Sequence, residues 1–255
     1  MEILNIFIFF IFGTLFGSFL TVVGQRLPKG EKFIISRSHC DTCQHELKLF
    51  EMIPFFSFVF LRGRCRYCHN KINTISTYME LFLGILFALS YYLFGYSYNL
   101  FIALGISTML VLISVSDITY LVIPDEILVI YSLYFIIVNL VFMGISYSIT
   151  QILYGLFLFL VMYIIMLLGN LFLKKESLGG GDIKMMFVFG LILDPLLGAL
   201  SIFIASVIAL PISLFILYKT KNNLIPFGPF LLTSLTFIYY TSIKSNDIIA
   251  FLLSI

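Results

Sequence analysis

The sequence has few charged residues, which excludes most classes of water-soluble protein. Asp, Glu, Lys and Arg make up 11% of the 255 residues, whereas soluble domains carry about 25%. Hydrophobic residues reach 61% and the mean hydropathy is +1.09. A water-soluble core cannot bury so much apolar surface, so lipid is the expected solvent. We therefore expect a polytopic helical membrane protein.

The sequence also lacks the residues of several hydrolytic sites. It contains three histidines, all in one polar stretch over residues 24–77, and no HExxH sequence. This distribution argues against Ser-His-Asp and Cys-His arrangements and against a zinc-protease helix. No internal repeat and no glycine-rich nucleotide-binding pattern is visible. Chemistry based on acidic side chains remains.

Eight apolar runs predict an all-α polytopic membrane protein with about eight transmembrane helices. A crossing takes roughly 20 apolar residues, and six or seven crossings remain open because the run at 185–193 is too short. That run is either a half-span extended by residues 179–184 or part of a longer segment kinked at Asp194 and Pro195. The runs cover residues 3–23, 78–95, 100–116, 127–144, 149–173, 185–193, 196–218 and 228–243.

The distribution of basic residues predicts the orientation in the membrane. No Lys or Arg precedes the first run and no small-residue cleavage site follows it, so we expect a retained first helix, residues 1–23, with the N-terminus outside. The loops that then face the cytoplasm hold every one of the 15 Lys and Arg residues except Lys244. The positive-inside rule predicts this asymmetry. Because topology explains the basic residues, we expect no nucleic acid partner.

All four cysteines lie in the polar loop, residues 24–77. They form two CxxC pairs with 21 residues between them (44–64), namely Cys40 with Cys43 and Cys65 with Cys68. Such spacing is typical of a four-cysteine tetrahedral zinc site. Disulfides, a redox pair or free thiols are the alternatives, although a cytoplasmic loop disfavours stable disulfides. His39, His45 and His69 lie beside the pairs and are alternative ligands. Because four thiolates complete the coordination shell, the expected zinc is structural.

Ionisable residues in or beside membrane spans are candidates for function. Asp117 ends an apolar run, where an acid opposes the helix dipole and no basic residue follows nearby to pair with it. Asp125 follows Pro124 at an expected helix start and suits a capping role. The full set is Glu80, Asp117, Asp125, Glu126, Asp182 and Asp194.

Asp182 follows three glycines, Gly179, Gly180 and Gly181, at an expected helix start. Glycines cost backbone entropy, but they let another backbone, such as an extended peptide, approach closely. A flexible linker is the alternative reading. Two carboxylates from separate spans can share a proton and activate water, one as base and the other as acid. We expect Asp117 and Asp182 to form such a catalytic pair.

These motifs, in this order and spacing, resemble the type IV prepilin peptidase family, a GxGD class of membrane aspartyl proteases. The resemblance extends almost from end to end and includes the two CxxC pairs. Its further elements are the stretches 17–28 and 78–81, Asp117 with residues 123–125, residues 179–184 and residues 226–230.

The resemblance implies an aspartyl protease domain over residues 78–255, following the first helix (1–23) and the zinc loop (24–77). It implies removal of the basic leader from prepilins, pseudopilins or competence pilins at the cytoplasmic face. Many members with the cysteine loop also methylate the new amino terminus with S-adenosylmethionine. Thr21 stands where the family usually has Asn. Gly63 and Glu80 are candidates for the methyl-transfer site. The implied partners are such pilins and the lipid bilayer.

Three other functions fit part of the pattern. A transporter or channel would use buried acids to move ions, but it does not explain the cysteine pairs. A GxGD protease for another membrane substrate shares the acids. A scaffold without chemistry leaves the acid after three glycines unexplained.

Overall fold

The computed structural model describes residues 1–31, 43, 45–46, 60–71, 74–173, 179–220 and 225–253. Within these ranges the regular elements are helices and none is a strand; Arg64 and Lys71 form an isolated antiparallel bridge. The predicted all-α class is therefore confirmed. The chain divides into two compact units, residues 1–96 and 97–255. The functional division into residues 1–23, 24–77 and 78–255 stays a prediction.

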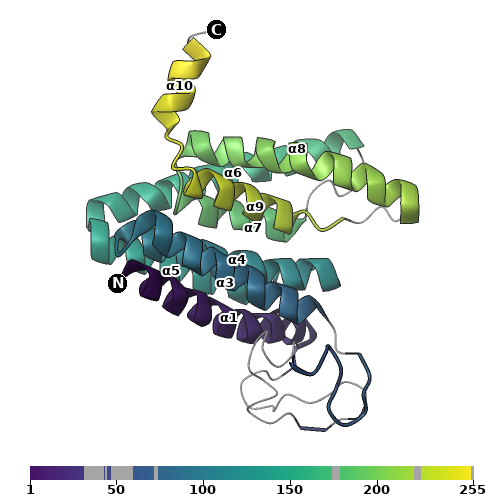
Figure 1. The fold of residues 1–255 in the computed structure, drawn as a ribbon. Helices are drawn as coiled ribbons and strands as arrows, with labels where there is room; N and C mark the ends of the chain where they lie inside the picture. The colour runs from purple at the N-terminus through teal and green to yellow at the C-terminus, as the bar shows by residue number, and fades with distance from the viewer. Residues whose placement is uncertain are drawn as a thin grey trace. The chain divides into compact units, whose positions relative to one another are not determined.

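The first unit pairs two long helices (Figure 1): α1 (Glu2–Arg26), which continues into the short 3-10 helix η1 (Leu27–Lys29), and α3 (Thr74–Phe94). A Cβ atom at Gly17 would lie 2.8 Å from Cα of Glu80, so the two backbones touch there. Gly13, one turn away, is equally close to Gly84. Small residues that let backbones meet are typical of helix pairs within membranes.

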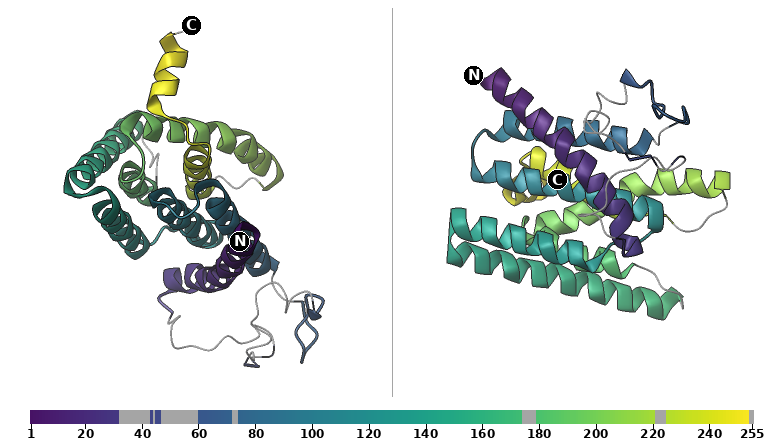
Figure 2. Two further views of the ribbon diagram at one scale, coloured as in Figure 1. Left: turned by 60° about the vertical axis from the view of Figure 1, so that its left-hand side comes forward. Right: turned by 90° about the horizontal axis from the view of Figure 1, so that it is seen from below.

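The second unit has α4 (Tyr98–Tyr120) at its centre, with most of its residues buried. Helices α5 and α9 pack on α4, α6 packs on α5 and α7, and α8 packs on α9. Figure 2 gives two further views of this arrangement. The remaining helices of the unit are α5 (Asp125–Met143), α6 (Ile145–Leu173), α7 (Gly180–Gly190), α8 (Pro195–Thr220), α9 (Gly228–Tyr240) and α10 (Ser245–Leu253).

All eight predicted apolar runs contain a helix, in the order α1 and α3 to α9. In the described part of the chain, six helices are long and apolar enough to cross a membrane. The other two, α7 with 11 residues and α9 with 13, are shorter than a bilayer crossing. Helix α7 begins at Gly180 and is separated from α8 by residues 191–194, so it is a half-length helix rather than part of a kinked span.

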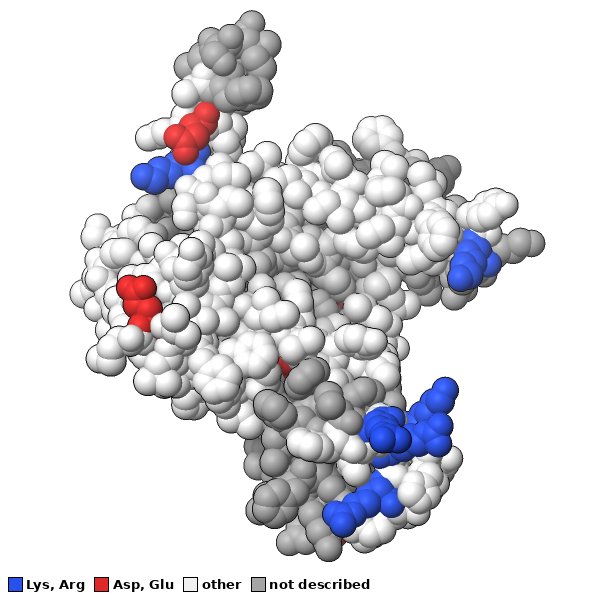
Figure 3. Space-filling view, viewed as in Figure 1, with Lys and Arg blue, Asp and Glu red and all other residues white. Residues whose placement is uncertain are grey.

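The outer helices of the second unit expose apolar side chains. In α6 and in α8 alike, only 17% of an apolar 18-residue window is buried. Figure 3 shows few charged side chains over the helices on the face it presents. Water would not solvate such surfaces favourably. The protein is a multi-pass membrane protein whose exposed helix faces suit lipid.

Candidate active site

Asp117 lies in the last turn of α4 and is only 6% exposed. Its Oδ2 atom accepts a hydrogen bond of 3.0 Å from the backbone N–H of Gly228, the first residue of α9. The N-terminus of a helix has free N–H groups and a partial positive charge, which favour a carboxylate. The start of α9 is therefore the polar partner of Asp117.

The α4–α5 link, residues 121–124, folds tightly beside Asp117. Leu121 takes a left-handed conformation with φ of 56°, and its N–H donates to the Asp117 carbonyl oxygen at 2.8 Å. The Ser116 hydroxyl donates to the Val122 carbonyl oxygen at 2.6 Å. These bonds end α4 immediately after the acid and fix the course of the link.

Asp182 lies in the first turn of α7 and is 8% exposed. Its buried Oδ1 atom has no hydrogen-bond partner among the described residues. Helix α7 is not one of the six candidate spans. Burial, and after it the charge of the neighbouring Asp117 carboxylate, raises the pKa of Asp182 to about 7. The structure thus brings Asp117 and Asp182, 65 positions apart (182 − 117), to one buried end of the second unit.

Ile123 lies between the elements that carry the two acids. A Cβ atom at Gly181 would be 2.8 Å from Cβ of Ile123, and one at Gly228 would be 3.2 Å from its Cδ1. A Cβ at Gly228 would also be 2.9 Å from Oδ2 of Asp117. Glycine at 181 and 228 therefore lets α7 and α9 close on the α4–α5 link.

The three glycines before Asp182 have different surroundings. The side chain of Ile123 occupies the space beside Gly181, whereas a Cβ at Gly179 would lie 3.1 Å from Oδ2 of Asp182. Gly180 is exposed, and nothing among the described residues lies within 4 Å of a Cβ built on it. Only Gly180 thus keeps the open approach expected of all three.

Two other acids of the second unit, Asp125 and Asp194, have separate partners. Both carboxylate oxygens of Asp125 accept from Lys184 Nζ at 2.7 Å, and α5 has no side-chain cap bond at its start. The expected capping role of Asp125 is therefore replaced by an ion pair with α7. Asp194 accepts from the N–H of Leu197 at 3.0 Å and so caps the start of α8.

In the first unit, three of the four predicted metal ligands cluster. The Sγ atoms of Cys43, Cys65 and Cys68 all lie within 4.8 Å of one another. Cys43 and Cys65 are 4.0 Å apart, far beyond the 2.05 Å of a disulfide. Thiolates on a tetrahedral zinc are about 3.8 Å apart, so the donor set suits this metal. Cys40 lies outside the described residues.

Two backbone hydrogen bonds close the turn that carries Cys65. The N–H of Cys65 donates to the Asn70 carbonyl oxygen at 2.9 Å, and the N–H of His69 donates to the Cys65 carbonyl oxygen at 3.0 Å. The His45 ring lies against the Tyr67 ring, with centroids 3.6 Å apart and the ring planes tilted by 39°. Neither His45 nor His69 is part of the thiol cluster, and His39 lies outside the described residues.

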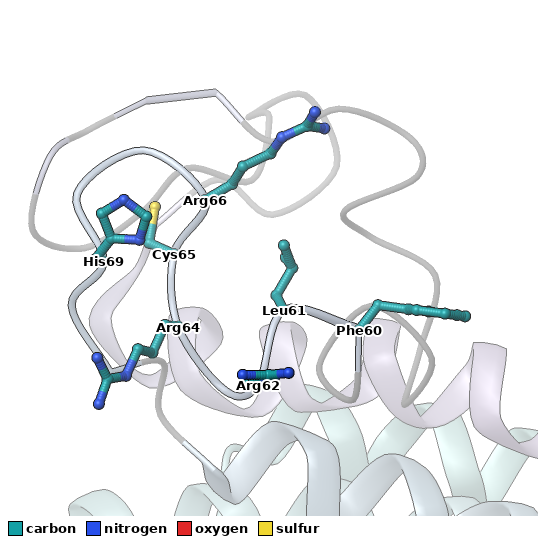
Figure 4. A pocket seen from close by; sticks show the side chains of 7 residues that line it. All are labelled: Phe60, Leu61, Arg62, Arg64, Cys65, Arg66 and His69. Carbon is teal, nitrogen blue, oxygen red and sulfur yellow. The ribbon is translucent and has the colours of Figure 1, made fainter.

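A cavity of about 550 Å³ opens beside Cys65. Figure 4 shows that its arginine side chains point in different directions and do not converge on one point. Gly63 has φ of 67° in the adjacent turn, and Glu80 is buried in α3. Neither of these two predicted methyl-transfer residues lines the cavity. Its walls are Phe60, Leu61, Arg62, Arg64, Cys65, Arg66 and His69.

Sequence reasoning gave no role to three residues that shape the acid pair: Ile123, Lys184 and Gly228. All three fall in the motifs at residues 123–125, 179–184 and 226–230. Membership of these motifs was the sequence feature that could have indicated a role for them. Their contacts join segments remote in sequence, so no local pattern reveals them.

Comparison with known proteins identifies two family matches along the chain. The model of the bacterial peptidase A24 N-terminal domain matches residues 11–94, and that of the type IV leader peptidase family matches residues 104–214. The cysteine pairs fall in the first match, and Asp117 and Asp182 fall in the second.

Three curated relatives share the name prepilin leader peptidase/N-methyltransferase. That of Bacillus subtilis is 32% identical over 192 residues, which cover 73% of each chain. That of Vibrio cholerae is 25% identical over 94% of this chain and 98% of its own. That of Stutzerimonas stutzeri is 27% identical over 87% of this chain and 85% of its own. No solved structure is significantly similar. The chain therefore belongs to the type IV leader peptidase family.

Proposed function

We propose that this protein is a membrane aspartyl endopeptidase that removes the leader from type IV prepilins or pilin-like proteins, with Asp117 and Asp182 as its catalytic pair. The observation that carries the proposal is that two buried carboxylates, from α4 and α7, lie close enough to interact electrostatically. Asp117 contributes to the raised pKa of Asp182, and Asp182 has an unpartnered oxygen available to a water or a substrate. Family membership supplies the substrate class.

The surroundings of the two acids support different roles. Asp117 accepts the Gly228 N–H at a helix start, an arrangement suited to a carboxylate. No described group donates to Oδ1 of Asp182, and the pKa of this acid is about 7. The proton shared by the pair therefore resides on Asp182 at rest, and Asp117 is the base.

Cleavage then proceeds by activated water. Asp117 takes one proton from water while the remaining hydroxide bonds to the carbonyl carbon of the scissile peptide, and Asp182 gives its proton to the developing oxyanion. When the C–N bond breaks, the carbonyl re-forms. The leaving nitrogen receives the proton that Asp117 took from water, and the proton on the oxygen returns to Asp182. One water is consumed, and the acids regain their starting states.

The open side of Gly180 suits the approach of an extended substrate. Gly180 is two residues before Asp182, and no described group occupies the space beside it. A peptide backbone that passes over this first turn of α7 toward the acid meets no side chain at Gly180. In our proposal Gly180 is the approach point, whereas Gly179 and Gly181 serve local packing.

The cysteine cluster is proposed to hold a structural zinc through Cys40, Cys43, Cys65 and Cys68. Three of these thiols already lie within zinc-binding range of one another. When bound, zinc supplies folding free energy to a short polar loop. With four thiolates the shell is complete, so hydrolysis does not involve it.

Methylation of the new amino terminus with S-adenosylmethionine is a second proposed activity. It is supported by the names of the curated relatives, which combine leader peptidase and N-methyltransferase. Within the described part of the chain, the cavity beside Cys65 includes neither Gly63 nor Glu80. We therefore derive no methyl-transfer step from these residues.

The proposed orientation puts the N-terminus outside and the zinc loop and acids at the cytoplasmic face. The acid end of the second unit adjoins Lys184, and Lys219 ends α8. Basic residues favour the cytoplasmic side. The partners are pilin-like substrates and the bilayer of the cell membrane, without nucleic acid.

The test is a cleavage assay with the purified enzyme and a prepilin. Mass spectrometry reports leader loss as proteolysis and one added methyl group as transfer. Asp117→Asn and Asp182→Asn should each insert normally and lose nearly all cleavage, because each acid has a separate role. If either variant cleaves at the wild-type rate, the catalytic pair is wrong. If wild type cleaves only another membrane protein, the substrate class is wrong.

A further inference from the structure

The ion pair between Lys184 and Asp125 joins the start of α7 to the start of α5. Lys184 Nζ lies 2.7 Å from each carboxylate oxygen of Asp125, so the contact is symmetrical and close. The two side chains come from helices that begin 55 positions apart (180 − 125). The pair therefore fixes one helix start against another.

The two ends of α7 are held in different ways. At its far end, Gly190 meets Gly155 of α6 backbone to backbone. There the buried Asn139 side chain of α5 donates to the Leu191 carbonyl oxygen at 2.9 Å, and Tyr98 donates to Asn139 at 2.7 Å. Buried packing and two hydrogen bonds thus fix this end independently of any surface charge.

The near end, which carries Asp182, begins with Gly179, Gly180 and Gly181, whose backbones are intrinsically the least restricted. Its apolar side chains, such as Ile183, are buried as at the far end. Two further contacts join it to the α4–α5 link and the start of α5: the packing of Gly181 on Ile123 and the Lys184–Asp125 pair. Both contacts involve the segment 123–125, which directly follows the turn after Asp117.

Lys184 and Asp182 point away from each other around α7. Two residues correspond to about 200° of helical rotation, and accordingly Asp182 is buried whereas the Lys184 side chain is 51% exposed. The ion pair on the exposed face of α7 therefore constrains the rotation and depth of the buried face that carries Asp182. Lys184 thus acts on Asp182 through the helix rather than by direct contact.

The geometry points to Lys184 and Asp125 as positioning residues that hold Asp182 in register with Asp117. This inference rests on the proposed function and adds two residues to it. Exposed ion pairs contribute little to global stability, but small displacements of reacting groups have large kinetic effects. The pair should therefore matter for turnover and hardly at all for folding.

The test compares purified variants on a prepilin peptide. Lys184→Met and Asp125→Asn should each lower kcat by about tenfold, with KM and Tm close to wild type. Lys184→Arg should retain activity because it can still pair. The double variant Asp125→Lys/Lys184→Asp should exceed both of its single reversals. Glu126→Gln is the matched control, since Glu126 adjoins Asp125 and has no ion pair among the described residues.

Three results would overturn the inference: wild-type kcat in Lys184→Met, no recovery in the double variant, or a raised KM with kcat unchanged. The last would make Lys184 a substrate contact. Asp117→Asn is assayed in parallel. If Asp117→Asn cleaves normally, the proposed function fails; if it is inactive and the Lys184 variants are normal, only the positioning role fails.

Discussion

At the scale of single residues, Asp117 and Asp182 differ in the polar groups around them. Asp117 has a backbone N–H at hydrogen-bond distance, whereas one oxygen of Asp182 has no described partner. Two similar acids in unequal surroundings are how an enzyme obtains a base and an acid at the same pH. The glycines that border them set how closely each neighbour approaches.

Gly181→Ala and Gly180→Ala should therefore have opposite kinetic signatures. The new methyl group at 181 would lie 2.8 Å from Cβ of Ile123 and displace the start of α7, so kcat should fall by about tenfold or more. At 180 the methyl group meets nothing in the enzyme and would obstruct the substrate, so KM should rise with kcat nearly unchanged. Steady-state kinetics on one prepilin peptide separate the two. An unchanged KM in Gly180→Ala would contradict the proposed approach path.

The pH dependence of cleavage tests which acid holds the proton. Asp182 has a pKa of about 7 and must be protonated to act as the acid, so kcat/KM should fall as pH rises through this value. If Asp182 were the base instead, the rate would rise through the same range. A pH profile of the wild type on a substrate without titrating groups decides between them. Glu126→Gln should give the same profile as the wild type.

At the scale of elements, α7 is short because residues 191–194 turn before Pro195 starts α8. A helix of 11 residues is about 16 Å long, roughly half of a bilayer core. Helix α9, with 13 residues, is also short, and the N–H of its first residue donates to Asp117. Half-length helices therefore deliver both Asp182 and the partner of Asp117 to one place.

The cysteine-bearing turn is the element whose metal content can be measured directly. The purified protein should contain one zinc per chain, and Cys65→Ser with Cys68→Ser should remove it, because both thiols belong to the cluster. His69→Ala is the control and should retain zinc, since His69 is outside the cluster. Loss of the metal should reduce methylation or loop stability more than cleavage. Elemental analysis without zinc, together with oxidised cysteines, would refute the site.

At the scale of the whole molecule, the long helices and the basic loops predict a membrane topology. Six helices are long and apolar enough to cross, among the described residues. The acids lie at the end of the second unit where α4 ends and α5, α7 and α9 begin. Consecutive spans alternate in direction, so the α5–α6 connection at Gly144 lies at the opposite end.

Labelling of introduced cysteines in intact cells tests this topology. An impermeant thiol reagent should label Ser146→Cys, beside the α5–α6 connection, without permeabilisation. Lys219→Cys, at the end of α8, should be labelled only after permeabilisation. The wild type is the control, because its native cysteines should be protected inside intact cells. The reverse labelling pattern would invert the proposed orientation.

Much of the fold could be predicted from the sequence because helix formation in lipid is a local matter. Every backbone polar group must be satisfied within its own segment there, so an apolar run is sufficient to predict a helix. The eight runs, the acids at their ends and the cysteine pairs were all identifiable from residue type and spacing. The family motifs then predicted which two acids to pair.

The tertiary structure alone decided what each acid meets. The hydrogen bond from Gly228 to Asp117 spans 111 positions, and the pair of Lys184 with Asp125 spans 59. No local rule specifies such contacts, because they depend on how helices pack once they exist. For that reason Asp125 was expected to cap α5, and only the packing of α7 shows that it binds Lys184 instead. Residue types fixed the available chemistry, whereas helix packing set the distances at which it can act.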